Sequence, residues 1–117
     1  MVTIKAGDKI LATNASYAKT FFQRLRGYMF RRIRAGSGLI FVLNKKSILH
    51  SSIHMLFVFG KLDVLWLDKQ KRVITIRRNM RPFIDRGQSQ KPAKYIVELP
   101  TGIESKIKEN MTLKFEN

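Results

Sequence analysis

The sequence predicts an α+β domain that is mainly β: a curled antiparallel sheet or small barrel-like domain with one N-terminal helix packed on it. Short apolar runs separated by turn residues occur along most of the chain, which is typical of strands. One segment near the N-terminus instead repeats its apolar residues at helical spacing. The length of 117 residues suits one hydrophobic core, so we expect a single domain over residues 1–117.

The first expected elements are a short strand or hairpin around Gly7-Asp8 and, after it, the helix. Asn14 or Ser16 can cap the helix by accepting a backbone N–H bond, and Gly27 favours its end. The spacing i, i+3, i+4 and i+7 places four apolar residues on the face that packs against the sheet: Ala18, Phe21, Phe22 and Leu25.

The rest of the chain is predicted to form strands joined by turns. Gly60-Lys61 is expected to place the strand before it beside the strand after it, and Lys69-Gln70-Lys71 to close a hairpin. Residues 79–94 contain two prolines and Gly87, so we expect a long loop there, of the kind that is functional or mobile. The predicted strands cover residues 39–43, 51–59, 62–68, 73–77, 95–99 and 112–115, and residues 103–108 are predicted to form a single helical turn.

The composition excludes several kinds of site. The chain has no cysteine, which excludes disulfides, iron–sulfur clusters, thiolate zinc sites and a cysteine nucleophile. The N-terminus carries no apolar run of the signal-peptide kind, and no stretch approaches the ~20 apolar residues that span a bilayer. We therefore expect a cytoplasmic protein without a membrane partner.

Charge is the one extreme property of this chain, with a formal net value of +15 at pH 7. Residues 19–34 hold six basic residues and no acid, and residues 69–94 hold nine basic residues against Asp85 alone. Residues 95–117 are nearly neutral. This distribution favours an anionic partner, such as nucleic acid or a phosphate-bearing ligand. The alternative is that the charge serves solubility and no specific anion.

Four separated blocks carry a resemblance to a known family. They are Arg24-Leu25-Arg26-Gly27-Tyr28-Met29-Phe30-Arg31, Ser52-Ile53-His54-Met55, Leu62-Asp63-Val64-Leu65-Trp66-Leu67-Asp68 and Tyr95-Ile96-Val97-Glu98-Leu99-Pro100-Thr101-Gly102. In this order and spacing the chain resembles domain-of-unknown-function family 192, an uncharacterised protein family, over residues 9–115, and looks like its archaeal branch. Lys61 and Glu109-Asn110 depart from the turn residues usual in the family. The resemblance implies a β-rich domain with one N-terminal helix and supplies neither a reaction nor catalytic residues.

A polar pocket is one hypothesis for function. If the Gly60-Lys61 turn pairs the two strands beside it, His54 and Asp63 come together, and Arg24 at the end of the helix can join them. Such a pocket, with an acid, a base and an anion-binding group, would suit a small-molecule enzyme or a ligand-binding protein. The alternative is that Asp63 caps a turn and His54 bonds a neighbouring backbone group.

Other candidate sites have weaker signals. His50 and His54 have the spacing of metal ligands on a helix, but on a strand their side chains lie about 13 Å apart, so we expect no metal site. No catalytic motif is present, and we expect no cofactor. The Met and aromatic residues, which indicate core packing or alternatively an apolar ligand cavity, are Met29, Met55, Phe57 and Trp66.

The leading hypothesis is a small binding module with a basic surface. Guanidinium groups at the helix exit and along the strand before the long loop suit phosphate oxygens. The expected anion-binding residues are Arg31, Arg32, Arg77, Arg78 and Arg81. Arginines of this kind contact a backbone and do not read sequence. A protein-interaction domain is a third hypothesis, which would require a large exposed apolar patch, and the sequence does not predict the oligomeric state.

Overall fold

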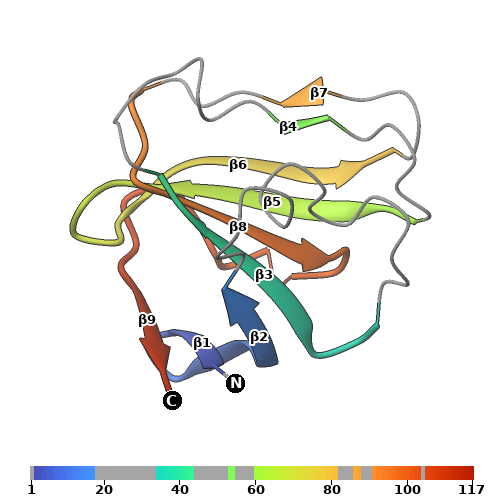
Figure 1. The fold of residues 1–117 in the computed structure, drawn as a ribbon, viewed down its shortest axis with the longest axis horizontal. Coiled ribbons are helices and arrows are strands. Elements are labelled where there is room, and N and C mark those ends of the chain that lie inside the picture. The colour runs from blue at the N-terminus through green and yellow to red at the C-terminus, as the bar shows by residue number, and fades with distance from the viewer. Residues whose placement is uncertain are drawn as a thin grey trace.

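The computed structural model describes residues 2–17, 34–43, 53–54, 60–81, 86–87, 91–103 and 105–117. These residues form strands and turns, without a helix among them. Figure 1 shows the strands as one large curled sheet and one small separate sheet. The strands are β1 (Val2–Ala6), β2 (Lys9–Tyr17), β3 (Ser37–Val42), β4 (Ile53–His54), β5 (Leu62–Leu67), β6 (Val73–Met80), β7 (Arg86–Gly87), β8 (Tyr95–Pro100) and β9 (Leu113–Glu116).

Seven strands form the large sheet in the order β6-β5-β8-β3-β2-β1-β9. Every neighbouring pair is antiparallel except β2 and β3, which run parallel. The prediction of an antiparallel sheet is therefore wrong at this pair. Parallel neighbours need a long crossover connection, and residues 18–36 supply it between Tyr17 and Ser37.

The two outer strands of this sheet meet at one end, which confirms the predicted curl. Arg72, just before β6, forms a β-bridge with Thr112, just before β9. The backbone N–H of Val73 donates to the carbonyl of Met111 (2.8 Å), and that of Leu113 donates to the carbonyl of Lys71 (2.9 Å). The sheet thus approaches a closed barrel, because hydrogen bonds between β6 and the start of β9 join its edges.

The curl gives the sheet an inner and an outer face, each with its own apolar cluster. All seven strands contribute to the inner cluster, which includes Ile4, Ile40, Leu65 and Val97. The outer cluster takes most of its buried residues from β3 and β5, and it includes the fully buried Trp66. Apolar residues therefore alternate between two buried faces along β5, whose six residues are all buried, as expected for a central strand.

Two sequence predictions change at the ends of elements, and a third is not tested. Asn14 and Ser16, expected to cap a helix, lie in β2, which continues to Tyr17. The helical face from Ala18 to Leu25 lies outside the described residues, so the N-terminal helix stays a prediction. Within 103–108, Ser105 and Lys106 form a turn instead of the expected helical turn.

The predicted loop 79–94 also begins too early and contains a strand. β6 extends to Met80, and Arg86–Gly87 forms β7, which pairs with β4. Figure 1 shows this two-stranded sheet separate from the seven-stranded one. The register of β5 and β6 shifts between Leu62↔Met80 and Val64↔Arg77. This β-bulge, which sequence periodicity does not indicate, lies in the part of β6 that extends three residues beyond the expected strand.

Candidate functional site

Asp63 is a buried carboxylate with its oxygens already bonded. Its exposed fraction is 1%. Oδ1 accepts the backbone N–H of Asn79 at 2.8 Å, and Oδ2 accepts those of Gly102 at 2.9 Å and Ile103 at 3.0 Å. The Thr101 hydroxyl lies within reach of Oδ1 at 3.3 Å and also contacts the side-chain oxygen of Asn79. A buried carboxylate is tolerated when hydrogen bonds replace its hydration, and here four donors do so.

This arrangement gives Asp63 the turn-capping role that the sequence left open. It fixes the turn after β8 and the end of β6 to the start of β5. A cavity of about 190 Å³ lies beside that turn. Among the described residues that line it, Asp63 is not included. It is lined by Ile10, Leu11, Ala35, Gly36 and Pro100–Ile103.

The strand pairing that suggested the polar pocket is wrong. β5 pairs with β6 on one edge and β8 on the other, so the strand of His54 cannot lie beside that of Asp63. His54 pairs instead with Arg86 in the small sheet. Arg24 and the side chain of His54 lie outside the described part of the chain, so the convergence of Arg24, His54 and Asp63 stays a prediction.

A bulge at the end of β6 shapes the basic surface. Arg78 and Asn79 both fall opposite Asp63, because Arg77 pairs with Val64 and Met80 with Leu62. Asn79 has a positive φ of 54°, a left-handed conformation in which asparagine is enriched among non-glycine residues, and its N–H turns toward Asp63. Bulges re-aim side chains, and this one leaves the consecutive residues Arg77, Arg78 and Asn79 exposed.

Arg78 is anchored as well as exposed. Its guanidinium donates to the carbonyl of Ile103 at 3.2 Å and to that of Ile107 at 2.5 Å. These bonds hold the segment after β8 against β6 and fix the plane of the guanidinium. Of the other predicted anion-binding residues, Arg77 and Arg81 are exposed, while Arg31 and Arg32 lie outside the described residues.

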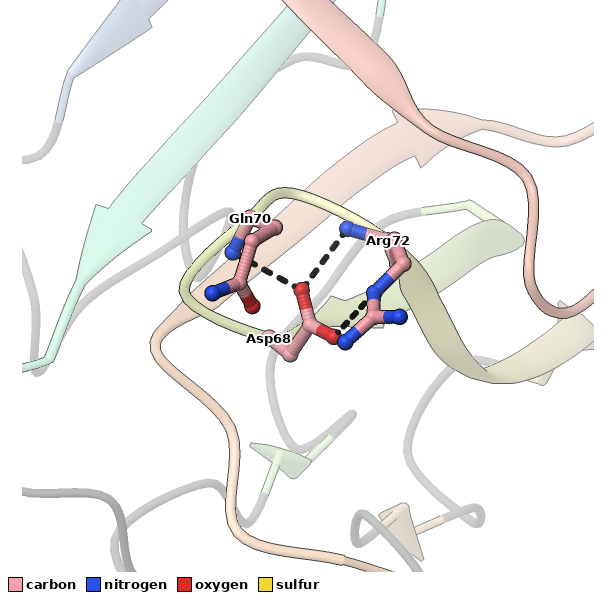
Figure 2. Close-up of polar contacts among 3 residues, drawn as sticks. All are labelled: Asp68, Gln70 and Arg72. Atoms are coloured by element: carbon pink, nitrogen blue, oxygen red, sulfur yellow. Dashed lines mark hydrogen bonds and ion pairs between the residues drawn. The ribbon is translucent and has the colours of Figure 1, made fainter.

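The positive charge of Arg72 is paired with the carboxylate of Asp68, as Figure 2 shows. Its Nε lies 2.8 Å from Oδ2 of Asp68, and Oδ1 accepts the backbone N–H groups of Gln70 and Arg72, each at 2.9 Å. Burial raises the pKa of the Asp68 carboxyl, but these hydrogen bonds and the charge of Arg72 outweigh burial and leave that pKa below its ordinary value. The Asp68 carboxylate thus organises the β5–β6 hairpin turn.

Sequence reasoning missed an aromatic cluster at the end of the barrel near this turn. The rings of Tyr17 and Tyr95 each meet Phe115 edge-on, with centroids 6.4 and 5.6 Å apart. Nζ of Lys71 lies 5.3 Å from the centre of the Tyr95 ring and 5.4 Å from that of Phe115, within cation–π range. Burial, and then the neighbouring Tyr95, raise the pKa of Tyr17. Pairings between strands far apart in the sequence bring these rings together, and the sequence carries no local signal for them.

Glu98 is a second buried acid that the sequence did not single out. Its exposed fraction is 3%, and it pairs with Val64 on one side and Leu39 on the other. Its position inside the apolar run of a central strand is the signal that could have identified it, because carboxylates are almost never fully buried without a partner.

Several alternatives gain no support within the described residues. They contain no group of three His, Asp or Glu side chains able to hold a metal ion, and His50 lies outside them. A bilayer-spanning helix is not found among them. Trp66 is a core residue, while Met29, Met55 and Phe57 fall outside the described part. The one large apolar side chain exposed there is Ile10, at 56%, which is no extended interaction patch.

The fold and sequence match proteins whose functions are not established. A structure from Novosphingobium aromaticivorans, of a protein of unknown function, aligns with a TM-score of 0.80 and 21% identity over 97% of this chain and 82% of its own. One from Sinorhizobium meliloti, of a protein proposed to be a transcription regulator, aligns with a TM-score of 0.82 and 22% identity over 97% and 91%. At these identities the likeness shows the fold alone.

Archaeal relatives are closer in sequence. A UPF0127 protein of Pyrococcus furiosus is 35% identical over 88% of this chain and 84% of its own length. A UPF0127 protein of Thermococcus sibiricus is 34% identical over 88% of this chain, but the alignment spans only 65% of that relative. The model of the DUF192 family, described as uncharacterized ACR, matches residues 2–115. With nearly the whole chain matched and relatives of archaeal type, this chain belongs to the DUF192 family.

Proposed function

We propose that this protein is a small non-enzymatic binding module whose basic surface along β6 contacts an anionic partner, a nucleic-acid backbone. One observation carries the proposal: residues 72–81 hold four arginines and no acid, and all four are exposed. They lie on or beside a strand at the edge of the sheet. The proposal includes a cytoplasmic location.

The two acids that precede β6 most closely along the chain are engaged within the fold, which supports a positive field at this edge. Asp63 is buried and bonded to backbone N–H groups, and Asp68 is paired with Arg72. We therefore assign the surface to Arg77, Arg78 and Arg81. From Arg77 to Arg81, four steps of extended chain span roughly 13 Å, the length of a short run of backbone phosphates.

Such a surface binds through counterion release and charge-assisted hydrogen bonds. Guanidinium groups pair with two phosphate oxygens at once, and each phosphate neutralised lowers the slope of log K against log salt by about 0.7 on a single strand. We expect weak sequence preference, because contacts to phosphates position a protein without reading base edges.

The test measures binding of a fluorescent mixed-sequence single strand and of the matching duplex by anisotropy over a salt series. The double variant Arg77→Ala/Arg81→Ala is compared with Lys5→Ala/Lys114→Ala, which removes the same charge from paired positions on β1 and β9. We expect the β6 variant to flatten the salt slope by about 1.4 and to weaken binding more than the control does. Absence of binding even in low salt, or equal effects of the two variants, would overturn the proposal.

A further inference from the structure

A shallow depression lies where the segment after β8 packs against β6. Its volume is about 450 Å³. Ile76 and Ile107 supply its apolar part, and Ile107 is fully buried. The polar residues that line it are Arg78, Ser105, Lys108 and Glu109.

Three sets of contacts fix the walls of this depression. The N–H of Ile103 is bonded to Asp63, the carbonyls of Ile103 and Ile107 accept from Arg78, and the N–H of Asn110 donates to the carbonyl of Val73 at 2.8 Å. The segment is thus attached to the sheet before, within and after the polar residues. A site held in this way binds without a large ordering cost.

The polar groups suit a tetrahedral dianion better than a carboxylate. Arg78 offers a planar guanidinium held in one orientation by two carbonyls. Lys108 offers an ammonium and Ser105 a neutral hydroxyl donor. A phosphate group has enough oxygens to accept from all three, and arginine with lysine is a common set for phosphate. Glu109 opposes an anion there, so its charge limits the affinity.

We propose that this depression, bounded by Arg78, Ser105 and Lys108, is a phosphate subsite, which holds one phosphate group of the partner. The inference rests on the proposed function, since it names the place where one phosphate of the anionic partner is held. The same chemistry would accept a free phosphate or a terminal phosphomonoester, and the experiment separates these sources.

The first arm uses inorganic phosphate as the probe and follows backbone amide shifts in two-dimensional NMR spectra. We expect saturable shifts concentrated at residues 105–109 and Arg78. Lys108→Ala should weaken phosphate binding about three- to tenfold, and Ser105→Ala about twofold, as for exposed charged and neutral hydrogen bonds. Glu109→Gln should strengthen binding, and the equal-charge control Lys114→Ala on β9 should leave it within twofold.

Lys108→Ala and Glu109→Gln are expected to change phosphate affinity in opposite directions, although the two residues are adjacent, so this arm distinguishes the subsite from a general effect of charge. Lys108 and Glu109 are both exposed, so folding of either variant is not at risk, and far-UV circular dichroism verifies it. Shifts spread over the whole basic surface, or equal losses in Lys108→Ala and Lys114→Ala, would overturn the subsite.

The second arm separates the subsite from the proposed function. Inorganic phosphate, a nucleoside 5′-monophosphate and an oligonucleotide without terminal phosphates are titrated in turn. Shifts at 105–109 with all three assign the subsite to a backbone phosphate, while shifts with only the first two assign it to a free or terminal phosphate and remove the nucleic-acid partner. Oligonucleotide binding through Arg77 and Arg81 without shifts at 105–109 would overturn the subsite and leave the proposed function standing.

Discussion

The carboxylate of Asp63 accepts the backbone N–H of Gly102 at 2.9 Å, across 39 positions of sequence. This bond fastens the turn after β8 to the first residues of β5. Because the same carboxylate also binds Asn79 and Ile103, one side chain holds three segments at this end of the barrel.

Replacing Asp63 by asparagine should lower the free energy of unfolding by about 3 kcal/mol. In the parent both carboxylate oxygens accept backbone N–H groups, whereas the asparagine amide has only one oxygen that can accept. Urea unfolding measures the loss. Thr101→Val, which removes a single exposed donor, is the control and should cost under about 1 kcal/mol. An Asp63→Asn protein as stable as the parent would contradict the capping role and restore the carboxylate as a candidate for the pocket with Arg24 and His54.

Alanine should be tolerated worse at Gly102 than at Gly7. An added Cβ meets nothing within 4 Å at either position, but φ is 107° at Gly102 and 61° at Gly7. The φ of Gly7 lies in the left-handed region, which other residues reach at a cost of about 1 kcal/mol. The φ of Gly102 lies outside that region, and alanine there should cost about 2 kcal/mol or more. Unfolding midpoints of the two variants test this order, and the reverse order would contradict the backbone geometry of the turn.

Gly38 should resist enlargement for a different reason, which is crowding on the inner face. A Cβ there would lie 3.0 Å from Cδ2 of Leu99 and 3.3 Å from the Cβ of Ala15. Gly38→Ala should therefore cost about 1–3 kcal/mol through overpacking. The double variant with Leu99→Val should lose less than the sum of the two single losses, as a double-mutant cycle reveals. Strict additivity would show that the two side chains do not meet.

Stability should depend on Asp68 only where it is ionised. Its lowered pKa means that the folded state favours the carboxylate, so its contribution is present above the unfolded value near 3.8 and disappears as the pH falls through the lower folded value. The deficit in unfolding free energy of Asp68→Asn relative to the parent should thus be small at pH 7, because the pair is exposed and screened. It should be smaller still at pH 3, below the unfolded value. Asp8→Asn is the control in urea titrations at both pH values. A deficit that grows in acid would contradict the pairing with Arg72.

The sequence predicted the positions of the strands better than the pairing between them. Alternation and apolar runs located β5, β8 and the hairpin to β6, because those signals are local. The parallel pairing of β2 and β3 depends on a crossover through residues 18–36, and no local pattern encodes it. The misplaced neighbour of β5 has the same origin: a turn at Gly60-Lys61 allows a hairpin, but β8 takes that edge.

Arg77, Arg78 and Arg81 were selected as candidate anion-binding residues from charge alone. The structure places them exposed on or beside an edge strand, and their role in binding stays a prediction. The depression beside Arg78 was not predicted. Ser105 and Lys108 lie there because Arg78 binds the carbonyls of Ile103 and Ile107 and so holds their segment against β6, a long-range contact that no local pattern indicates. Asp63 gave a strong signal in the sequence but an ambiguous one, since buried carboxylates serve both caps and active sites.

The pairing of β1 with β9 also governs the order in which the molecule can form. Thr3 lies beside Glu116 in the finished sheet, so one edge of β1 has no partner until the ribosome has released β9. Contacts of such long sequence separation slow folding, and until they form β1 presents an exposed hydrogen-bonding edge. The sheet can therefore be completed during synthesis only once β9 is available, and we expect the chain to be more prone to aggregation before that point.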